Sequence, residues 1–550
     1  MNRKHNVRFS AAVSIIAVPL IALGLASFTS GVSKTKHVRL LHISDTHAQL
    51  DTHWEYLPED PSQLHRMGGY SRIRTALDEM RSTASGAVFT IDGGDTFQGS
   101  AIAAWTEGNA VVAPFNALHV DVGTPGNWEV VYGPQVFRKL MSALSEKVVC
   151  YNFHDKSTGQ RIFPPAVVLE RHGVRVAFIG MTDPTTTTRQ SPAEVVGLDT
   201  TRVEGLKEFV QDFKRREKPD LTVLVDHTGL APSVKLASDI PEFDVVLSGH
   251  THERVYRPIL VGKTIVVEPG SMGSFIGQLD LTLEGGAVTN YKFDLVGVDE
   301  GRFKENPQVK ALIDRNEAPF AKRLLEIVGQ TSERILRYDV LETSMDNLIA
   351  DAVRDAGHSN IGFTNGFRFS PPIPAGPITE ADLWNMLPLD AKLKSGKVTG
   401  AQIQRYLEQE MELVFSKDPF TLSGGWGPRP SGMSVVFQAK APPGERVKNV
   451  KIAGVALDPG RVYTIAGCER DGEPMDVICR LRGAQEAKYV SGTIHSVLRQ
   501  YLQAHSPIAP TRDGRVRASD LPDTAWSQYG ILQQLWQIPG DARSVAVPQS

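Results

Sequence analysis

Short apolar runs alternate with longer amphipathic stretches between Val38 and about Val298. The runs are rich in valine and isoleucine, and many of them end in a polar or glycine-containing loop. Such runs are typical of strands that are buried in a layered α/β domain, with functional groups at the strand ends. We therefore predict strands at the segments VRLLHIS, AVFTIDG, KVVCYNF, VRVAFIGM, LTVLVDH, FDVVLSGH and KTIVVEPG.

The pattern changes after residue 300. From Asn306 to about Ile327 the apolar residues have helical spacing around a central proline, which predicts a connecting helical segment. Amphipathic helices are then predicted in TSMDNLIADAVRDAG and GAQIQRYLEQEMELVF, and strands in MSVVFQ, VKNVKIAGVAL and RVYTIAG. The expected fold is α/β, with an N-terminal layered α/β-sandwich domain over residues 38–300, a helical linker over 301–330 and a C-terminal α/β domain over 331–545.

The N-terminus has the pattern of a targeting segment. Arg3, Lys4 and Arg8 precede an apolar run from Ala11 to Phe28, and small residues fit cleavage after Ala26. This pattern predicts a secretory signal peptide within residues 1–30, with an uncleaved N-terminal anchor as the alternative. We therefore expect a periplasmic or secreted protein with no membrane attachment beyond that possible anchor.

Composition limits the kinds of partner. Hydrophobic residues make up 41% of the 550 residues and charged residues 22%, as in ordinary globular proteins of more than one domain. A net charge of −3 without a long basic block makes a nucleic acid polymer an unexpected partner. Three cysteines are too few for a disulfide scaffold, so a Cys468–Cys479 pair with Cys150 left over, or three buried thiols, both remain open.

Five predicted strand-end loops carry metal-ligand residue types: SDTH, GGDTFQGS, PGNWE, VDHTG and SGHTH. Residues two apart on an extended segment point the same way, so Asp-x-His and His-x-His each offer two donors. Seven donors exceed the needs of one tetrahedral ion, and oxygen and imidazole donors without thiolate favour two divalent ions of manganese, zinc or iron. Such a pair attracts an oxyanion. The predicted metal ligands are Asp45, His47, Asp95, Asn127, His227, His250 and His252.

These motifs, in this order, resemble those of the calcineurin-like metallophosphoesterases of the 5′-nucleotidase branch. The segment TNGFRFSPPIPAGPITEADLWNMLP likewise resembles the start of that branch's C-terminal substrate-binding domain, so the resemblance covers nearly all of the mature chain. It implies a catalytic dimetal centre in which Asp95 bridges the two ions and Asn127 is a ligand of the second. By the same resemblance, one ion would be held by Asp45, His47, Asp95 and His252, and the other by Asp95, Asn127, His227 and His250.

The sequence departs from the nucleotidase pattern Gly-Asn-His-Glu-x-Asp at two positions, where Trp128 replaces the histidine and Val131 the aspartate. An indole N–H donates a hydrogen bond but does not give up its proton at working pH. Losing a positioned acid typically costs ~10²–10⁴-fold in rate for a basic leaving group. A thiol, with a reference pKa of about 8.5, departs as the anion unaided. The substitution therefore favours sulfur chemistry.

Other segments, among them NWEVVYG, AIAAWTEG and HRMGGYSRI, resemble the SoxB-type sulfate thiohydrolases of the same superfamily. That resemblance implies two manganese ions and release of sulfate from a thiosulfonate, a sulfonate linked to the sulfur of a cysteine on a carrier protein. The segment GMTDPTTTTRQSP instead resembles the nucleotidase branch, and no twin-arginine pair is present.

Substrate-binding residues are predicted in the second domain. Arg368, in the NGFRF motif with Asn365, is expected to clamp an oxyanion, with a surface or interdomain ion pair as the alternative. Phe367, Phe369 and Trp426 would stack a base, line a channel for a carrier peptide or form core. Trp426 is expected on a loop, because SGGWGPRPSG is rich in glycine and proline.

Three functions follow from these features. The first is a SoxB-like hydrolase acting on a sulfur-linked sulfonate, and the second is a periplasmic 5′-nucleotidase or other phosphomonoesterase. The third is a non-catalytic metal-binding relative. The presence of all seven donors argues against the third, since a protein without chemistry has little need of two ions.

Overall fold

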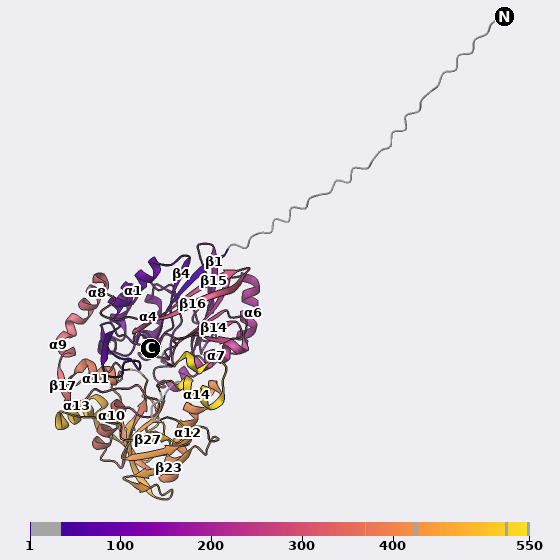
Figure 1. Ribbon diagram of the computed structural model, residues 1–550. Coiled ribbons are helices and arrows are strands. Elements are labelled where there is room, and N and C mark those ends of the chain that lie inside the picture. Colours follow the sequence, from indigo (N-terminus) through magenta and orange to yellow (C-terminus); the bar gives the residue numbers. More distant parts are fainter. Residues whose placement is uncertain (2–34, 369, 423–425, 523–525, 547–550) are drawn as a thin grey trace. The chain divides into compact units, whose positions relative to one another are not determined.

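The computed structural model describes Met1 and residues 35–368, 370–422, 426–522 and 526–546 (Figure 1). Nearly all of the predicted signal segment and Phe369 lie outside the described residues. Within the described part, no helix combines the length and apolar character needed to cross a membrane. Residues Thr35–Ser550 form one unit, in which a first lobe contains strands β1 to β16 and a second lobe contains strands β17 to β27.

The first lobe is built on two six-stranded sheets. One has the order β16-β15-β1-β4-β5-β6, with β1 (Lys36–Ile43), β4 (Ala87–Asp92), β5 (Val122–Gly123), β6 (Lys147–Val148), β15 (Phe275–Glu284) and β16 (Ala287–Gly297). The other has the order β13-β14-β12-β11-β9-β8, with β8 (Ala166–Arg171), β9 (Val174–Thr182), β11 (Leu221–His227), β12 (Val245–Ser248), β13 (Ile259–Val261) and β14 (Thr264–Val267). Short pairs are formed by β2 (His53–Tyr56) with β3 (Leu64–Met67) and by β7 (His154–Asp155) with β10 (Leu198–Asp199).

Strand β1 shows why the apolar runs lack alternation. Leu40 packs in one core cluster with Phe178 of the other sheet, whereas Leu41 and Ile43 belong to a second cluster beneath helices. Both faces of the strand are therefore buried. The helices on the two outer sides are α1 (Tyr70–Ser82), α2 (Ala101–Trp105), α3 (Asn109–Asn116) and α4 (Pro134–Ala143) for the first sheet, and α6 (Leu206–Glu217) and α7 (Leu230–Asp239) for the second.

One strand is much shorter than predicted. The run KVVCYNF forms a strand only at Lys147–Val148. Beyond it, the Val149 N–H donates to the Gly123 carbonyl of the first sheet (2.9 Å), and the Tyr151 N–H donates to the Gly180 carbonyl of the second (2.7 Å). The segment crosses from one sheet to the other, so it is buried without pairing regularly with either.

The predicted connecting segment is helical. It comprises α8 (Pro307–Glu317), the 3₁₀ turn η1 (Ala318–Phe320) and α9 (Ala321–Leu324). The Asn306 side chain caps α8 by accepting from the N–H groups of Gln308 and Val309. Since Pro319 cannot continue an α-helix, it falls in the 3₁₀ turn.

The second lobe is also α/β, as predicted. Its main sheet has the order β21-β18-β25-β20-β26, with β18 (Ile361–Gly366), β20 (Lys392–Thr399), β21 (Trp426–Ser431), β25 (Val462–Cys468) and β26 (Gln485–Thr493). A four-stranded sheet contains β22 (Met433–Phe437), β23 (Val447–Ile452), β24 (Val455–Ala456) and β27 (Val516–Ala518), and a pair contains β17 (Ile327–Thr331) and β19 (Gly376–Thr379). The helices of this lobe are α10 (Ser344–Ala356), α11 (Glu380–Met386), α12 (Gly400–Phe415), η2 (Pro419–Thr421) and α13 (Ile494–His505).

The C-terminal helix α14 (Gln528–Trp536), followed by η3 (Ala542–Ser544), contacts both lobes. Figure 1 shows it in yellow between α7 and α12. Tyr529 belongs to the core cluster of the first lobe and donates its N–H to Glu253 Oε1 (2.9 Å). Leu535 belongs to a cluster of the second lobe, and Gln528 donates to the Val414 carbonyl (2.9 Å). This helix follows the last strand of the second lobe in sequence and packs against both lobes.

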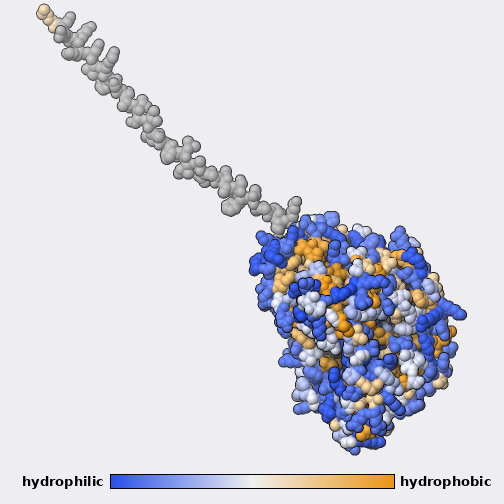
Figure 2. Space-filling model, turned by 180° about the vertical axis from the view of Figure 1, so that it is seen from behind, coloured by the Kyte–Doolittle hydropathy of each residue, from blue (hydrophilic) through white to orange (hydrophobic). Residues whose placement is uncertain are grey.

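The face shown in Figure 2 is covered mainly by hydrophilic residues, with apolar residues interspersed. Exposed large apolar side chains, such as Leu325 and Val455, are few beside the buried core. Single exposed apolar residues are ordinary on a folded protein.

Candidate metal centre

The seven predicted donors lie at the carboxyl ends of strands from both sheets of the first lobe. Strands β1, β4 and β5 run parallel in one sheet, and β9, β11 and β12 run parallel in the other. Their carboxyl ends therefore open at one edge, where the strand-end loops meet. Asp45 and His47 follow β1, Asp95 follows β4, Asn127 follows β5, His227 ends β11, and His250 and His252 follow β12.

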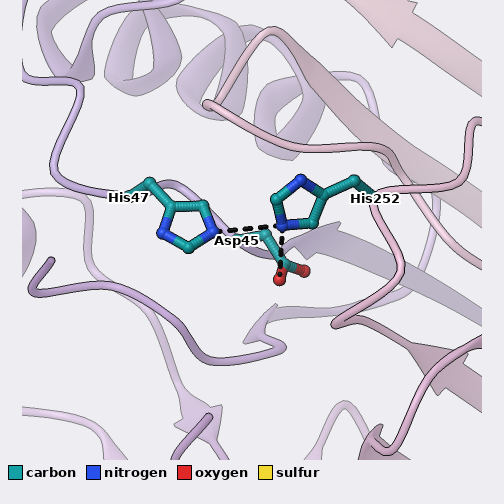
Figure 3. Close-up of side chains that lie close together, drawn as sticks. All are labelled: Asp45, His47 and His252. Carbon is teal, nitrogen blue, oxygen red and sulfur yellow. Dashed lines mark hydrogen bonds and ion pairs between the residues drawn. The ribbon is translucent and has the colours of Figure 1, made fainter. Parts of the chain in front are cut away.

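Asp45, His47 and His252 form the first group (Figure 3). The Nε2 atoms of His47 and His252 are 3.0 Å apart, and His252 Nε2 is 3.3 Å from Asp45 Oδ1. The other ring nitrogen of His47, Nδ1, lies 2.9 Å from the Gln98 carbonyl. A hydrogen bond there fixes the ring so that Nε2 faces the other two side chains.

Asp95, His227 and His250 form the second group. His227 Nε2 lies 3.2 Å from Asp95 Oδ2 and 3.3 Å from Asn127 Oδ1, while its Nδ1 lies 2.6 Å from the Gly93 carbonyl. Asp95 Oδ2 is also 3.9 Å from His47 Nε2 of the first group. Asp95 is thus within reach of both groups.

The tripeptide Asn-Trp-Glu builds the loop around Asp95. Asn127 presents its amide oxygen, the Trp128 N–H donates to Asp95 Oδ1 (2.8 Å), and Glu129 Oε1 accepts from the Thr96 N–H (2.6 Å). A Cβ at Gly126 would lie 2.2 Å from Asp95 Oδ1, so only glycine fits there. Backbone and side-chain bonds together fix the aspartate.

Five of the seven donors have a left-handed backbone, which is uncommon for residues other than glycine. Such conformations cost of order 1–3 kcal/mol each and cluster at functional sites. The φ angles are 52° for Asp45, 47° for His47, 56° for Asp95, 77° for His250 and 58° for His252. The tight turns after the strands bring the donors together at the expense of local strain.

Burial and mutual charge shift the pKa values of the donors. Burial, and next the charge of His252, lowers the pKa of His47 to about 4. Burial would lower the pKa of His227 as well, but Asp95 and Asp45 raise it well above its usual value. Burial would raise the pKa of Asp45, but His227 and His252 hold it below its usual range. The carboxylate is therefore ionised, the state in which it binds cations.

The donors fit a pair of divalent ions. Within each group the candidate ligand atoms all lie within 4.8 Å of one another. His250 Nδ1 is buried and has no hydrogen-bond partner among the described residues, so it is available to an ion. Carboxylate, amide and imidazole donors without thiolate suit manganese, zinc or iron.

A cavity of about 490 Å³ opens on this centre and is lined by both lobes. Its volume is that of a site for a small ligand. The first lobe contributes Asp95, Asn127, Trp128, His250 and His252, and the second contributes all four described residues predicted to bind substrate, Asn365, Phe367, Arg368 and Trp426.

The predicted substrate-binding residues have different surroundings. The ring of Phe367 lies 6.1 Å from that of Trp128, centroid to centroid, and Arg368 donates through Nη2 to the His250 carbonyl. Asn365 Oδ1 accepts from the thiol of Cys479 (3.6 Å). The prediction that Trp426 lies on a loop is wrong, because it begins β21 and packs in a core cluster while reaching the cavity. Pairing with β18 overrides the glycine and proline composition.

The three cysteines are free thiols, with Cys150 and Cys479 buried and Cys468 partly buried. The Cys468–Cys479 disulfide that the sequence left open is therefore not formed. Burial raises the pKa of the Cys479 thiol to about 11.

Several cavity residues were not predicted from the sequence, among them Arg189 and Glu194. Both follow β9, whose carboxyl end lies beside that of β11. Both lie too far beyond the end of β9 for the strand-end pattern that identified His227 to single them out, and the only signal for Arg189 was its place in the segment GMTDPTTTTRQSP.

Two family models match the chain. Residues 38–254 match the calcineurin-like phosphoesterase model, and residues 327–469 match the 5′-nucleotidase C-terminal domain model. The chain belongs to the calcineurin-like phosphoesterases with a 5′-nucleotidase C-terminal domain. It is therefore a metal-dependent hydrolase of this family, whose members bind two divalent ions, and the predicted two-domain fold is confirmed.

Relatives of this family carry different activities in their names. The chain is 26% identical to the trifunctional nucleotide phosphoesterase protein YfkN of Bacillus subtilis over 89% of its own length, but it spans only 36% of that protein. It is 23% identical to a 5′-nucleotidase of Vibrio cholerae, covering 87% of this chain and 92% of the relative. The structure of the sulfate thiohydrolase SoxB of Thermus thermophilus matches with a TM-score of 0.80 and 25% identity, over 89% of this chain and 98% of that one.

Proposed function

We propose that this phosphoesterase relative is a SoxB-like dimetal hydrolase that releases sulfate from a sulfur-linked sulfonate. The observation that carries the proposal is the position of Trp128. Its backbone holds Asp95 and its ring lines the cavity beside Phe367, so an indole occupies the place next to Asn127 where a nucleotidase has its imidazole. Val131, at the position of the partner aspartate, is buried and apolar.

The reaction in this proposal is hydrolysis of an S–S bond. Water attacks the sulfonate sulfur, an S–O bond forms as the S–S bond breaks, and the thiolate leaves with the bonding electron pair. The two protons of the water pass to solvent, which gives sulfate. Asp45, His47, Asp95 and His252 would hold one ion, and Asp95, Asn127, His227 and His250 the other. When bound, the two cations lower the pKa of water towards neutrality and neutralise negative charge on the substrate oxygens.

The remaining roles belong to side chains of the cavity. Arg368 would bind an oxyanion oxygen through its planar fork. Trp128 would exclude water from the leaving-group side and would not protonate the departing thiolate, which needs no proton. The proposal includes manganese as the resident metal and a periplasmic or secreted location, with a small substrate that is free or carried on a protein cysteine. We also propose that the metallophosphoesterase domain spans residues 38–300, the helical linker residues 301–330 and the 5′-nucleotidase-like domain residues 331–545.

Substrate ranking tests this function. With two metal ions per chain, hydrolysis of the S-sulfonate of cysteine is expected to exceed hydrolysis of AMP by at least about 10²-fold in kcat/KM, the typical worth of a positioned acid for a basic leaving group. Sulfate release and phosphate release are measured side by side. A higher kcat/KM for AMP than for the S-sulfonate would contradict the proposed thiohydrolase activity and support nucleotidase activity.

Glu194 favours phosphomonoester hydrolysis as a second candidate function. Its carboxyl lines the cavity, and Oε2 is buried without a hydrogen-bond partner among the described residues. Burial raises the pKa of Glu194 to about 7, Asp471 adds to the rise, and Ser191 and Arg470 oppose it. Tyr132 lies nearby. A neutral carboxyl at working pH is able to protonate an alkoxide leaving group.

The pH dependence separates the two functions. If Glu194 is the acid, kcat for an alkyl phosphomonoester falls as the pH rises through about 7, because the carboxyl then loses the proton that it donates. Glu194→Gln is expected to lower kcat and remove this limb. An unchanged profile in the variant would exclude Glu194 as the acid.

A further inference from the structure

Arg189 is a charged residue beside the second group of donors; it lies in the segment GMTDPTTTTRQSP but is not among the predicted site residues. It ends the short helix α5 (Thr186–Arg189) and lines the cavity. Its Nη2 lies 3.3 Å from His250 Nε2 and forms an ion pair with Asp183. Its Nε is buried and has no hydrogen-bond partner among the described residues. The guanidinium therefore has an unused donor beside the second group.

Arg368 reaches the same histidine from the second lobe. It donates through Nη2 to the His250 carbonyl, and its Nη1 is buried without a partner in the described part of the chain. Burial lowers the pKa of Arg368 to about 10, and the positive charge of Arg189 adds to the lowering. Two guanidiniums, one from each lobe, thus flank His250 with spare N–H groups. Each guanidinium therefore has an N–H group that could donate to an anion bound in the cavity beside His250.

The surroundings hold Arg189 in place. Asp183 Oδ1 accepts from the Thr185 N–H and hydroxyl, each at 2.8 Å, which fixes the carboxylate that pairs with the guanidinium. The next residue, Gln190, donates to the Asn127 carbonyl (2.7 Å), and Arg470 of the second lobe donates to the Arg189 carbonyl. The arginine is thereby tied to the Asn-Trp-Glu loop on one side and to the facing lobe on the other.

We propose that Arg189 binds the tetrahedral oxyanion of the substrate together with Arg368, and supplies transition-state charge where Trp128 cannot supply a proton. This inference rests on the proposed hydrolase function. An arginine suits the role because its planar fork contacts two oxygens at once, whereas a lysine offers a point charge. Positive charge fixed in advance stabilises developing negative charge without reorganisation. Arg189 would thus stabilise negative charge in the transition state, as the missing imidazole would, but it would not donate a proton to the leaving group.

Anion binding to the metal-loaded protein tests the proposal. Inorganic sulfate and inorganic phosphate are titrated by calorimetry into the wild type, Arg189→Gln, Arg189→Lys and the control Arg202→Gln. Arg202 is an exposed arginine that pairs with Asp199. Loss of a charged hydrogen bond is expected to weaken anion binding by roughly 10- to 100-fold in Arg189→Gln. The lysine variant should recover part of the affinity, and Arg202→Gln should bind as the wild type. Wild-type affinity in Arg189→Gln would overturn the proposal.

A purely structural role for the Arg189–Asp183 pair gives a different result. In that case Asp183→Asn and Arg189→Gln lower the melting temperature equally and leave the anion Kd unchanged, which also overturns the proposal. Metal content is measured in every variant. If the wild type binds no metal and turns over no substrate, the proposed function fails, whereas a failure of this inference leaves the wild type active and metal-loaded.

Discussion

Asp95→Asn is expected to remove metal from both groups of donors and to lower kcat/KM by roughly 10³-fold or more, since cations contribute several kcal/mol to such transition states. Asp95 lies within reach of His47 and His227, so the loss of its charge affects both sites. Asparagine keeps the shape of the side chain, and its carbonyl oxygen still accepts from the Trp128 N–H. The fold should therefore persist.

Elemental analysis and turnover are measured on the same preparations. Asp212→Asn is the matched control, because Asp212 is exposed and forms ion pairs with the surface residues Arg215 (2.5 Å) and Arg216 (3.0 Å). Full activity in Asp95→Asn with two ions still bound would contradict the proposed dimetal centre.

Restoring the imidazole and carboxylate at positions 128 and 131 is expected to raise the hydrolysis of alkyl phosphomonoesters by about 10²-fold or more, the lower range for a positioned general acid. The variant is Trp128→His with Val131→Asp. Position 128 lines the cavity beside Asn127, and the Val131 N–H donates to the Trp128 carbonyl (3.2 Å), so both side chains lie on one turn. Thiosulfonate hydrolysis should change little, because its leaving group needs no proton.

Trp128→Phe is the control for this experiment. It removes the indole without adding an acid and keeps an aromatic ring beside Phe367. A rise of equal size in Trp128→Phe would mean that space, and not a proton, limits the wild type. No rise in the double variant would contradict the leaving-group argument.

Most of the donor set could be predicted from sequence because these donors end or follow strands with clear apolar runs, whereas Asn127 follows the two-residue strand β5 and was found from its motif. Asp45, Asp95 and His227 sit directly at such strand ends, and parallel pairing then brings the ends together. The left-handed backbone conformations of Asp45 and His252 have no pattern in the local sequence that predicts them, because such conformations are uncommon for residues other than glycine.

Arg189 and Trp426 show what local sequence does not reveal. Arg189 belongs to a four-residue helix, too short for any periodicity, and its partner Asp183 and its neighbour His250 are set by tertiary structure. Trp426 stands in a composition typical of loops, but an available edge on β18 makes it a strand residue. Tertiary contacts decided both positions.

Helix α14 packs against both lobes and connects them. Separating the lobes would expose Tyr529 or Leu535 to solvent. Burial of a large apolar side chain stabilises a fold by about 1.5–3 kcal/mol. Separation of the two lobes is therefore opposed by the burial of α14 against both of them. The last helix of the chain, far in sequence from every predicted metal ligand, thus stabilises the arrangement of the two lobes that line the cavity.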